Sequence, residues 1–203
     1  MRAHLLSGLA VLALAAAAPL ASASADGLET GGISVTRGGG NHNTAKGDFS
    51  FAGQAIATVG GSALHGGRVF TQGGGNRNIA AGKFSAAFQD VTTVGGTAIG
   101  KGAVANTYGG HNLNLAKGFG SFAGQSVTTV GGTAFGPGAV SKTFGGHNAN
   151  LALGKFSSAT QDVLTIGGTA GPFGKNLTFG GANKNKALGF GSTADQQVIT
   201  VSP

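Results

Sequence analysis

The chain has 203 residues, of which 41 are glycine and none is cysteine, and its formal net charge is +7 at neutral pH. Charged residues make up only 9% of the chain, a composition unlike that of an ordinary globular enzyme. The lack of cysteine excludes disulfide bonds and thiolate metal sites, and a hydrophobic share of 40% is too high for a solvated, disordered chain.

The first 25 residues have the composition of a secretory signal peptide. Arg2 gives a positive start, residues 5–20 are apolar and rich in alanine, and Ala23, Ser24 and Ala25 supply the small residues of a cleavage site. The apolar run is too short for a membrane span, and polar sequence follows it directly. We therefore expect residues 1–25 to be removed on export and residues 26–35 to form an N-terminal segment. The mature protein is expected to be secreted, extracellular or at the cell surface, with no membrane span.

Residues 36–203 consist of five repeats, each of about 36 residues. Each repeat has a leading asparagine, and successive leading asparagines are 35, 36, 36 and 35 residues apart. These residues are Asn41, Asn76, Asn112, Asn148 and Asn183. A period this regular is typical of solenoids and other repeat arrays.

Recurrent and variable positions alternate within each repeat, which predicts β-strands because successive side chains of a strand point to opposite faces. One strand has the pattern Asn-x-Asn-x-Ala, and a second has Ser-x-Ala-x-Gln-x-Val-x-Thr. The parity changes between them, as between Gly47 and Ser50, which predicts a corner at the glycine. A Gly-Gly pair ends the second strand, and a short third segment such as Val140–Phe144 follows. The predicted fold is an all-β solenoid of five repeats.

Stacked repeats place equivalent side chains about 4.8 Å apart, so that side-chain amides can form ladders along the stack. A glutamine lies thirteen residues after each leading asparagine and is the second candidate for such a ladder. These residues are Gln54, Gln89, Gln125, Gln161 and Gln196. The sameness of the Asn, Gln and Ala positions favours that face as the interior. The alternative is that Phe49, Phe84 and Phe156 fill the core and the amides face outward. One or two coils per repeat are both compatible with the pattern.

Two stretches resemble the repeats of curli-type bacterial amyloid subunits: Phe144-Gly-Gly-His-Asn-Ala-Asn-Leu-Ala and Ala159-Thr-Gln-Asp-Val. The resemblance extends over all five repeats, although the unit here is longer than a curlin repeat and its Asn-to-Gln spacing is wider. It implies a β-solenoid that polymerises outside the cell, with the leading asparagines and the glutamines named above as the ladders that direct self-assembly. A nucleator or a cell-surface polysaccharide would be a further partner.

Other motifs give no evidence for catalysis, a cofactor or a metal. His42, His111 and His147 do not occupy equivalent positions and lack partner carboxylates, so we interpret them as exposed turn residues. The recurrent serines are explained as ladder positions, and no glycine-rich stretch completes a phosphate-binding motif. The basic residues, one or two per repeat, are too scattered to form a patch. We therefore expect no specific nucleic-acid partner.

The fifth repeat carries no capping helix or charged run, and an open sheet edge is a template for another chain. We therefore expect a non-enzymatic structural subunit that adds to itself by β-edge stacking, forming an extracellular amyloid-like fibre or matrix for adhesion or biofilm. The alternative is a monomeric solenoid that binds polysaccharide or ice through flat threonine and asparagine arrays. A glycine-rich coat protein without an ordered fibre is a third possibility. The threonine array comprises Thr36, Thr71, Thr107, Thr143 and Thr178.

Overall fold

The computed structural model describes residues 32–202. Every regular element in this range is a β-strand, so this part of the chain holds no helix that could cross a membrane. The strands form parallel sheets that stack as a solenoid, which confirms the predicted fold. The first strand begins at Ile33, three residues before the expected start of the repeats. The predicted signal peptide, residues 1–25, lies outside the described residues.

The strands belong to four parallel sheets, which we number in chain order. The first sheet contains β1 (Ile33–Arg37), β5 (Arg68–Gln72), β9 (Val104–Tyr108), β13 (Val140–Phe144) and β17 (Lys175–Phe179). The second contains β2 (Gly40–Lys46), β6 (Gly75–Ala81), β10 (His111–Lys117), β14 (His147–Leu153) and β18 (Ala182–Leu188). The third contains β3 (Phe51–Val59), β7 (Ala86–Val94), β11 (Phe122–Val130), β15 (Ser158–Ile166) and β19 (Thr193–Val201). The fourth contains the short strands β4 (Ser62–Ala63), β8 (Thr97–Ile99), β12 (Thr133–Phe135) and β16 (Thr169–Ala170).

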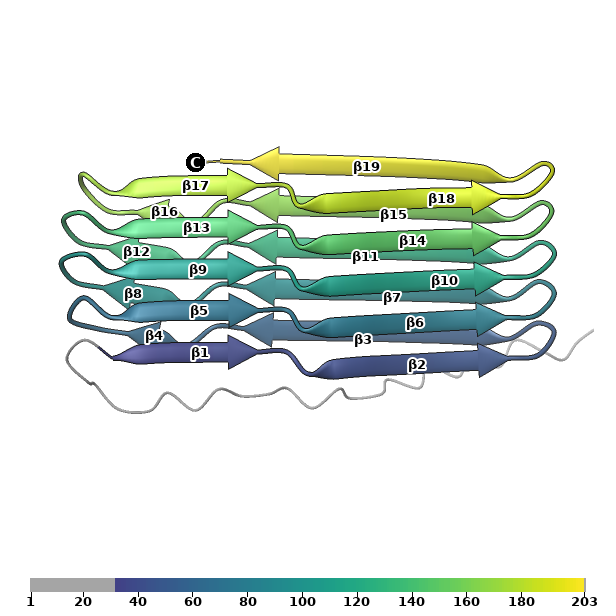
Figure 1. Ribbon diagram of the computed structural model, residues 1–203, viewed down its shortest axis with the longest axis horizontal. Coiled ribbons are helices and arrows are strands. Elements are labelled where there is room, and N and C mark those ends of the chain that lie inside the picture. Colours follow the sequence, from purple (N-terminus) through teal and green to yellow (C-terminus); the bar gives the residue numbers. More distant parts are fainter. Residues whose placement is uncertain (1–31, 203) are drawn as a thin grey trace, which may run out of the picture.

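Each repeat makes one flattened coil with two layers, which answers the question of one or two coils. The first and second sheets lie side by side in one layer, with their strands running in the same direction (Figure 1). The chain then turns, and the third and fourth sheets return in the opposite direction behind them (Figure 1). The fourth sheet was not predicted, because two or three residues are too few to show an alternating pattern.

The coils stack with every repeat in register. Asn112 lies opposite Asn76 and Asn148, and Gln125 lies opposite Gln89 and Gln161. This register follows from the constant repeat length, because a slip of one residue would move every inward side chain to the outside.

The interior is thin and is filled by the recurrent small and polar residues. Alanines of the second and third sheets form one apolar cluster, and Val91, Val127 and Val163 form another. The asparagines and glutamines of the inner coils are buried beside them. The structure therefore confirms the preferred orientation, with the Asn, Gln and Ala face inside. Phe49, Phe84 and Phe156 are 76%, 50% and 53% exposed, so the alternative phenylalanine core is wrong.

The predicted glycine corner lies at the turn between the two layers. Gly118 has a φ of +141°, and a Cβ added there would lie 1.9 Å from the carbonyl oxygen of Gly82 in the coil below. Only glycine allows this backbone angle together with such close stacking of turns. The equivalent turn of the coil below carries Phe84 at a φ of 52°, and its ring is half exposed on the surface.

Candidate self-assembly interface

The leading asparagines form a continuous ladder inside the second sheet. Asn76 Nδ2 donates to Asn112 Oδ1 at 2.7 Å, and Asn112 Nδ2 donates to Asn148 Oδ1 at 2.7 Å. Asn41 donates to Asn76 at 2.9 Å, and Asn148 donates to Asn183 at 2.7 Å. All four bonds therefore point towards the C-terminal coil. The inner three side chains are only 2–3% exposed. Each ladder bond therefore replaces a hydrogen bond to water that the amide loses on burial.

A second asparagine in each coil ties the two layers together. Asn114 Nδ2 donates to Asn150 Oδ1 at 3.0 Å in the next coil. The same amide nitrogen also lies within hydrogen-bond distance of the backbone carbonyls of Ala87 at 3.0 Å and Gly124 at 2.7 Å in the third sheet, so its two N–H groups are shared among three acceptors. Asn78 and Asn150 make equivalent bonds in their own coils. The sequence pattern had marked these asparagines as recurrent, but it did not reveal that they link one layer to the other.

The glutamines form a ladder in the third sheet that runs in the opposite direction. Gln125 Nε2 donates to Gln89 Oε1 at 2.6 Å, and Gln161 Nε2 donates to Gln125 Oε1 at 2.5 Å. Gln89 donates to Gln54 at 2.9 Å and Gln196 donates to Gln161 at 2.7 Å. These bonds point towards the N-terminal coil. The ten predicted residues therefore form two antiparallel ladders, one in each layer.

The two ladders end in groups that complement each other. At the first coil, the Asn41 Oδ1 acceptor and the Gln54 Nε2 donor have no partner within residues 32–202. At the last coil, Asn183 keeps one free N–H after its bond to Gly180, and Gln196 keeps a free Oε1. Head-to-tail stacking would therefore pair each donor with an acceptor of its own ladder.

The outer edges of the terminal coils are open among the described residues. The strands β1, β2 and β3 are paired only with β5, β6 and β7, and the strands β17, β18 and β19 only with β13, β14 and β15. Side chains at core positions are more exposed in the last coil than in the inner coils. Val198 is 44% exposed, whereas the equivalent Val163 is 3% exposed. Such edges present unpaired backbone groups to any chain that can add a strand.

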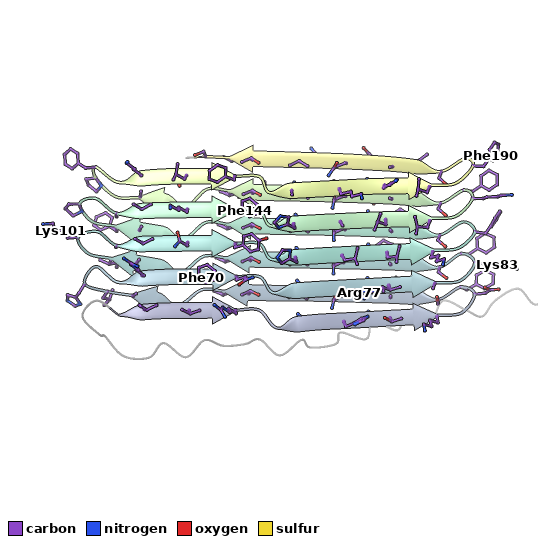
Figure 2. All side chains as sticks on the ribbon, in the orientation of Figure 1. Phe70, Arg77, Lys83, Lys101, Phe144 and Phe190 are labelled. Atoms are coloured by element: carbon purple, nitrogen blue, oxygen red, sulfur yellow. The ribbon has the colours of Figure 1, made fainter. Side chains whose placement is uncertain are left out.

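A row of aromatic rings follows the turn between the layers. It comprises Phe49, Phe84, Phe119, Phe156 and Phe190, with ring centroids 5.4–5.7 Å apart between adjacent coils. Figure 2 shows Phe190 at this edge of the molecule, and Lys83 at the same edge in the second coil. Phe119 and Phe190 are 43% and 75% exposed, so this row lies on the surface of the molecule.

The histidines are not equivalent, as the sequence indicated, but two of them meet. The rings of His111 and His147 stack with centroids 4.9 Å apart on the outer surface of the second sheet. Tyr108 Oη contacts His147 Nδ1, and partial burial raises the pKa of the Tyr108 phenol above its ordinary value. His42 lies in another column, opposite Arg77. Within residues 32–202 no group of three histidine, aspartate or glutamate side chains is placed to hold a metal ion.

The prediction that the basic residues are scattered is wrong. Nine exposed lysines and arginines lie on the outer surface of the first and second sheets, which we call the basic face. They are Arg37, Lys46, Arg68, Arg77, Lys117, Lys142, Lys175, Lys184 and Lys186. Figure 2 shows Arg77 on this face. The charges occupy different positions in different repeats, and only the placing of two segments in one layer brings them together.

The threonine array of the alternative function lies inside the solenoid. Thr71, Thr107 and Thr143 are at most 3% exposed. They, and the buried asparagines, therefore offer no contact surface to ice or sugar along the body of the solenoid.

A comparison of the chain with models of known protein families, with curated proteins and with solved structures found no match.

Proposed function

We propose that this protein is a non-enzymatic structural subunit that polymerises head to tail into an extracellular fibre or matrix. The last coil of one molecule adds the first coil of the next, and the first, second and third sheets continue across the junction; the fourth sheet has no strand in the last described coil. The observation that carries this proposal is the complementary ending of the two amide ladders. Surface adhesion and biofilm formation are the roles that such a fibre would serve.

The inward residues of the two terminal coils match one another, which supports the proposed junction. The inner positions of β18 hold Asn183, Asn185 and Ala187, and those of β2 hold Asn41, Asn43 and Ala45. In the third sheet, Gln196 and Thr200 would meet Gln54 and Thr58. In these two sheets the junction would therefore repeat the contacts that already hold neighbouring coils together inside one molecule.

The expected export and the resemblance of the repeats to curlin repeats support an extracellular setting. A monomeric binding module acting through threonine and asparagine arrays is less well supported, because those arrays are buried.

Gln196→Lys tests the junction, and Gln197→Lys is its matched control. Both substitutions add one positive charge to β19. Gln196 points into the ladder above Gln161, whereas Gln197 lies opposite the exposed Asp162 on the outer surface. Water can reach a lysine at position 196 in the monomer, but the next molecule would bury it without a partner. An unpaired buried charge costs several kcal/mol, so we expect the association constant to fall by about two orders of magnitude or more.

Seeded polymerisation of the purified protein, followed by light scattering and electron microscopy, measures this effect. We expect Gln197→Lys to polymerise like the unaltered chain and Gln196→Lys to remain monomeric, while circular dichroism shows folded β-structure in both. Equal polymerisation of the two variants, or an unaltered chain that stays monomeric when seeded at high concentration, would refute the proposal.

A further inference from the structure

The two broad faces of the solenoid differ completely in the sign of their strand charges. The basic face carries nine exposed lysines and arginines, and the strands of the first and second sheets contain no aspartate or glutamate. The strands of the third and fourth sheets contain Asp90, Asp162 and Asp195 and no lysine or arginine. A solvated surface that serves solubility alone would mix both signs, so this segregation requires another explanation.

The positive charges are spread evenly over the basic face. The strand register places Arg77 opposite His42 and Leu113, and Lys184 opposite Ala149. No two of the nine lie directly opposite each other on adjacent strands, an arrangement that limits repulsion between them. The result is a grid of cations rather than a tight pocket for one small anion.

A shallow trough of about 600 Å³ crosses this grid along the solenoid axis. One wall carries His111 and His147, the other carries Leu113 and Ala149, and Arg77 and Lys184 lie in its first and last coils. These two coils are three strand spacings apart, or about 14 Å. The trough is therefore long, straight and narrow, with a cation towards each end.

A second copy of this chain cannot neutralise the basic face. The acidic side offers only three aspartates against nine basic residues, so a face-to-face pair would leave most of the cations unmatched. The ligand must be richer in negative charge than any surface of this protein. A linear polyanion meets this condition, because it releases many counterions when it binds.

The shape of the face favours an acidic polysaccharide over a nucleic acid. A duplex is too wide to lie in a trough bounded by two adjacent side-chain columns. Single-stranded nucleic acid is held by bases that stack on free aromatic faces. Here, among the described residues, no phenylalanine, tyrosine or tryptophan lines the trough, and the rings of His111 and His147 on its wall stack on each other with centroids 4.9 Å apart.

We propose that the basic face binds a linear acidic polysaccharide, which lies along the solenoid axis in the trough and contacts Arg77 and Lys184. The binding site is complete in one molecule and does not depend on polymerisation. In a fibre, the first coil of the next molecule would extend the trough beyond Lys184. The protein would then act as a fibre that collects anionic matrix polymers along its length.

Binding of fluorescent polygalacturonate to the monomeric protein, measured by anisotropy at increasing salt, tests this proposal. The double variant R77Q/K184Q removes two charges from the trough. The control K83Q/K155Q removes two charges from exposed turn positions outside the basic face, and so has the same net charge. We expect R77Q/K184Q to weaken binding about tenfold and to reduce the slope of log affinity against log salt by about one to two. The control should change affinity less than about threefold, as screened surface charges away from the ligand do.

Three outcomes would overturn the proposal. Equal loss of binding in the two double variants would indicate attraction by net charge alone. Equal binding of neutral dextran would show that the charges are not used. Tighter binding of single-stranded oligothymidylate at the same charge concentration would identify a nucleic acid as the preferred partner. Because all measurements use monomer, failure here would leave the proposed polymerisation unaffected, and failure to polymerise would leave this site testable.

Discussion

Replacing one glutamine in the middle of the ladder should cost more stability than its size suggests. Gln125 is 4% exposed and makes two ladder bonds, one to Gln89 at 2.6 Å and one to Gln161 at 2.5 Å. Gln125→Leu leaves Gln89 Oε1 without its donor and Gln161 Nε2 without its acceptor, and those residues are 3% and 1% exposed. Each buried, unpaired group costs about 1–3 kcal/mol, so we expect a loss of about 2–6 kcal/mol.

The triple variant Q89L/Q125L/Q161L should cost much less than three times the single variant. It replaces the whole buried part of the ladder, and the remaining partners, Gln54 and Gln196, are reached by water. Removing both members of a buried pair is far milder than removing one, because no polar group is left unpaired. We therefore expect the triple variant to lose no more stability than Gln125→Leu alone.

Equilibrium urea unfolding of the monomer, followed by circular dichroism, gives the required free energies. Gln197→Leu is the matched control, since Gln197 is exposed on the outer surface of the same sheet, and it should change stability by less than about 0.5 kcal/mol. A single variant as mild as this control would refute the reasoning, and so would a triple variant whose loss equals the sum of three single losses.

Two further predictions concern the corner glycine and the single tyrosine. Gly118→Ala should cost several kcal/mol or prevent folding, because its Cβ would meet the Gly82 carbonyl, whereas Gly75→Ala meets nothing within 4 Å and should change the melting temperature little. The pKa of Tyr108, the only tyrosine of the chain, is raised by burial, so its neutral form is favoured in the folded state. Its contribution to stability is present below the pKa of the unfolded chain and is lost as the pH rises through the folded pKa. Ultraviolet titration should therefore show the phenol ionising at higher pH in the folded protein than in urea, and coinciding curves would contradict this.

The repeat pattern predicted most of the fold because it records both the strand period and the coil length. The alternation around Asn148 and Gln161 identified the inward faces, and the change of parity at Gly154 identified the corner between the layers. The ladders then followed from stacking like residues at strand spacing. Their opposite directions did not follow, because the direction of each amide depends on the backbone carbonyls and neighbours that it meets.

The sequence pattern predicts that the basic residues face outward, but it does not predict that they share one face. Arg77 and Lys184 each follow an inward asparagine by one residue, so alternation alone places them outward. What the sequence pattern did not reveal is that the third segment, with residues such as Lys142, shares a layer with the asparagine strand. The exposure of the turn phenylalanines could not be predicted for a different reason. Phe84 lies in a turn with positive φ, where the alternation of inward and outward side chains in a strand does not apply.

The most direct test of head-to-tail stacking is the mass per unit length of the fibre, measured by scanning transmission electron microscopy. Each molecule contributes five coils at about 4.8 Å, so the account predicts one molecule for every 24 Å or so along each protofilament. A value of one molecule per single strand spacing, about 4.8 Å, would mean that each chain lies flat in one layer of the fibre, and it would contradict the stacking of intact solenoids.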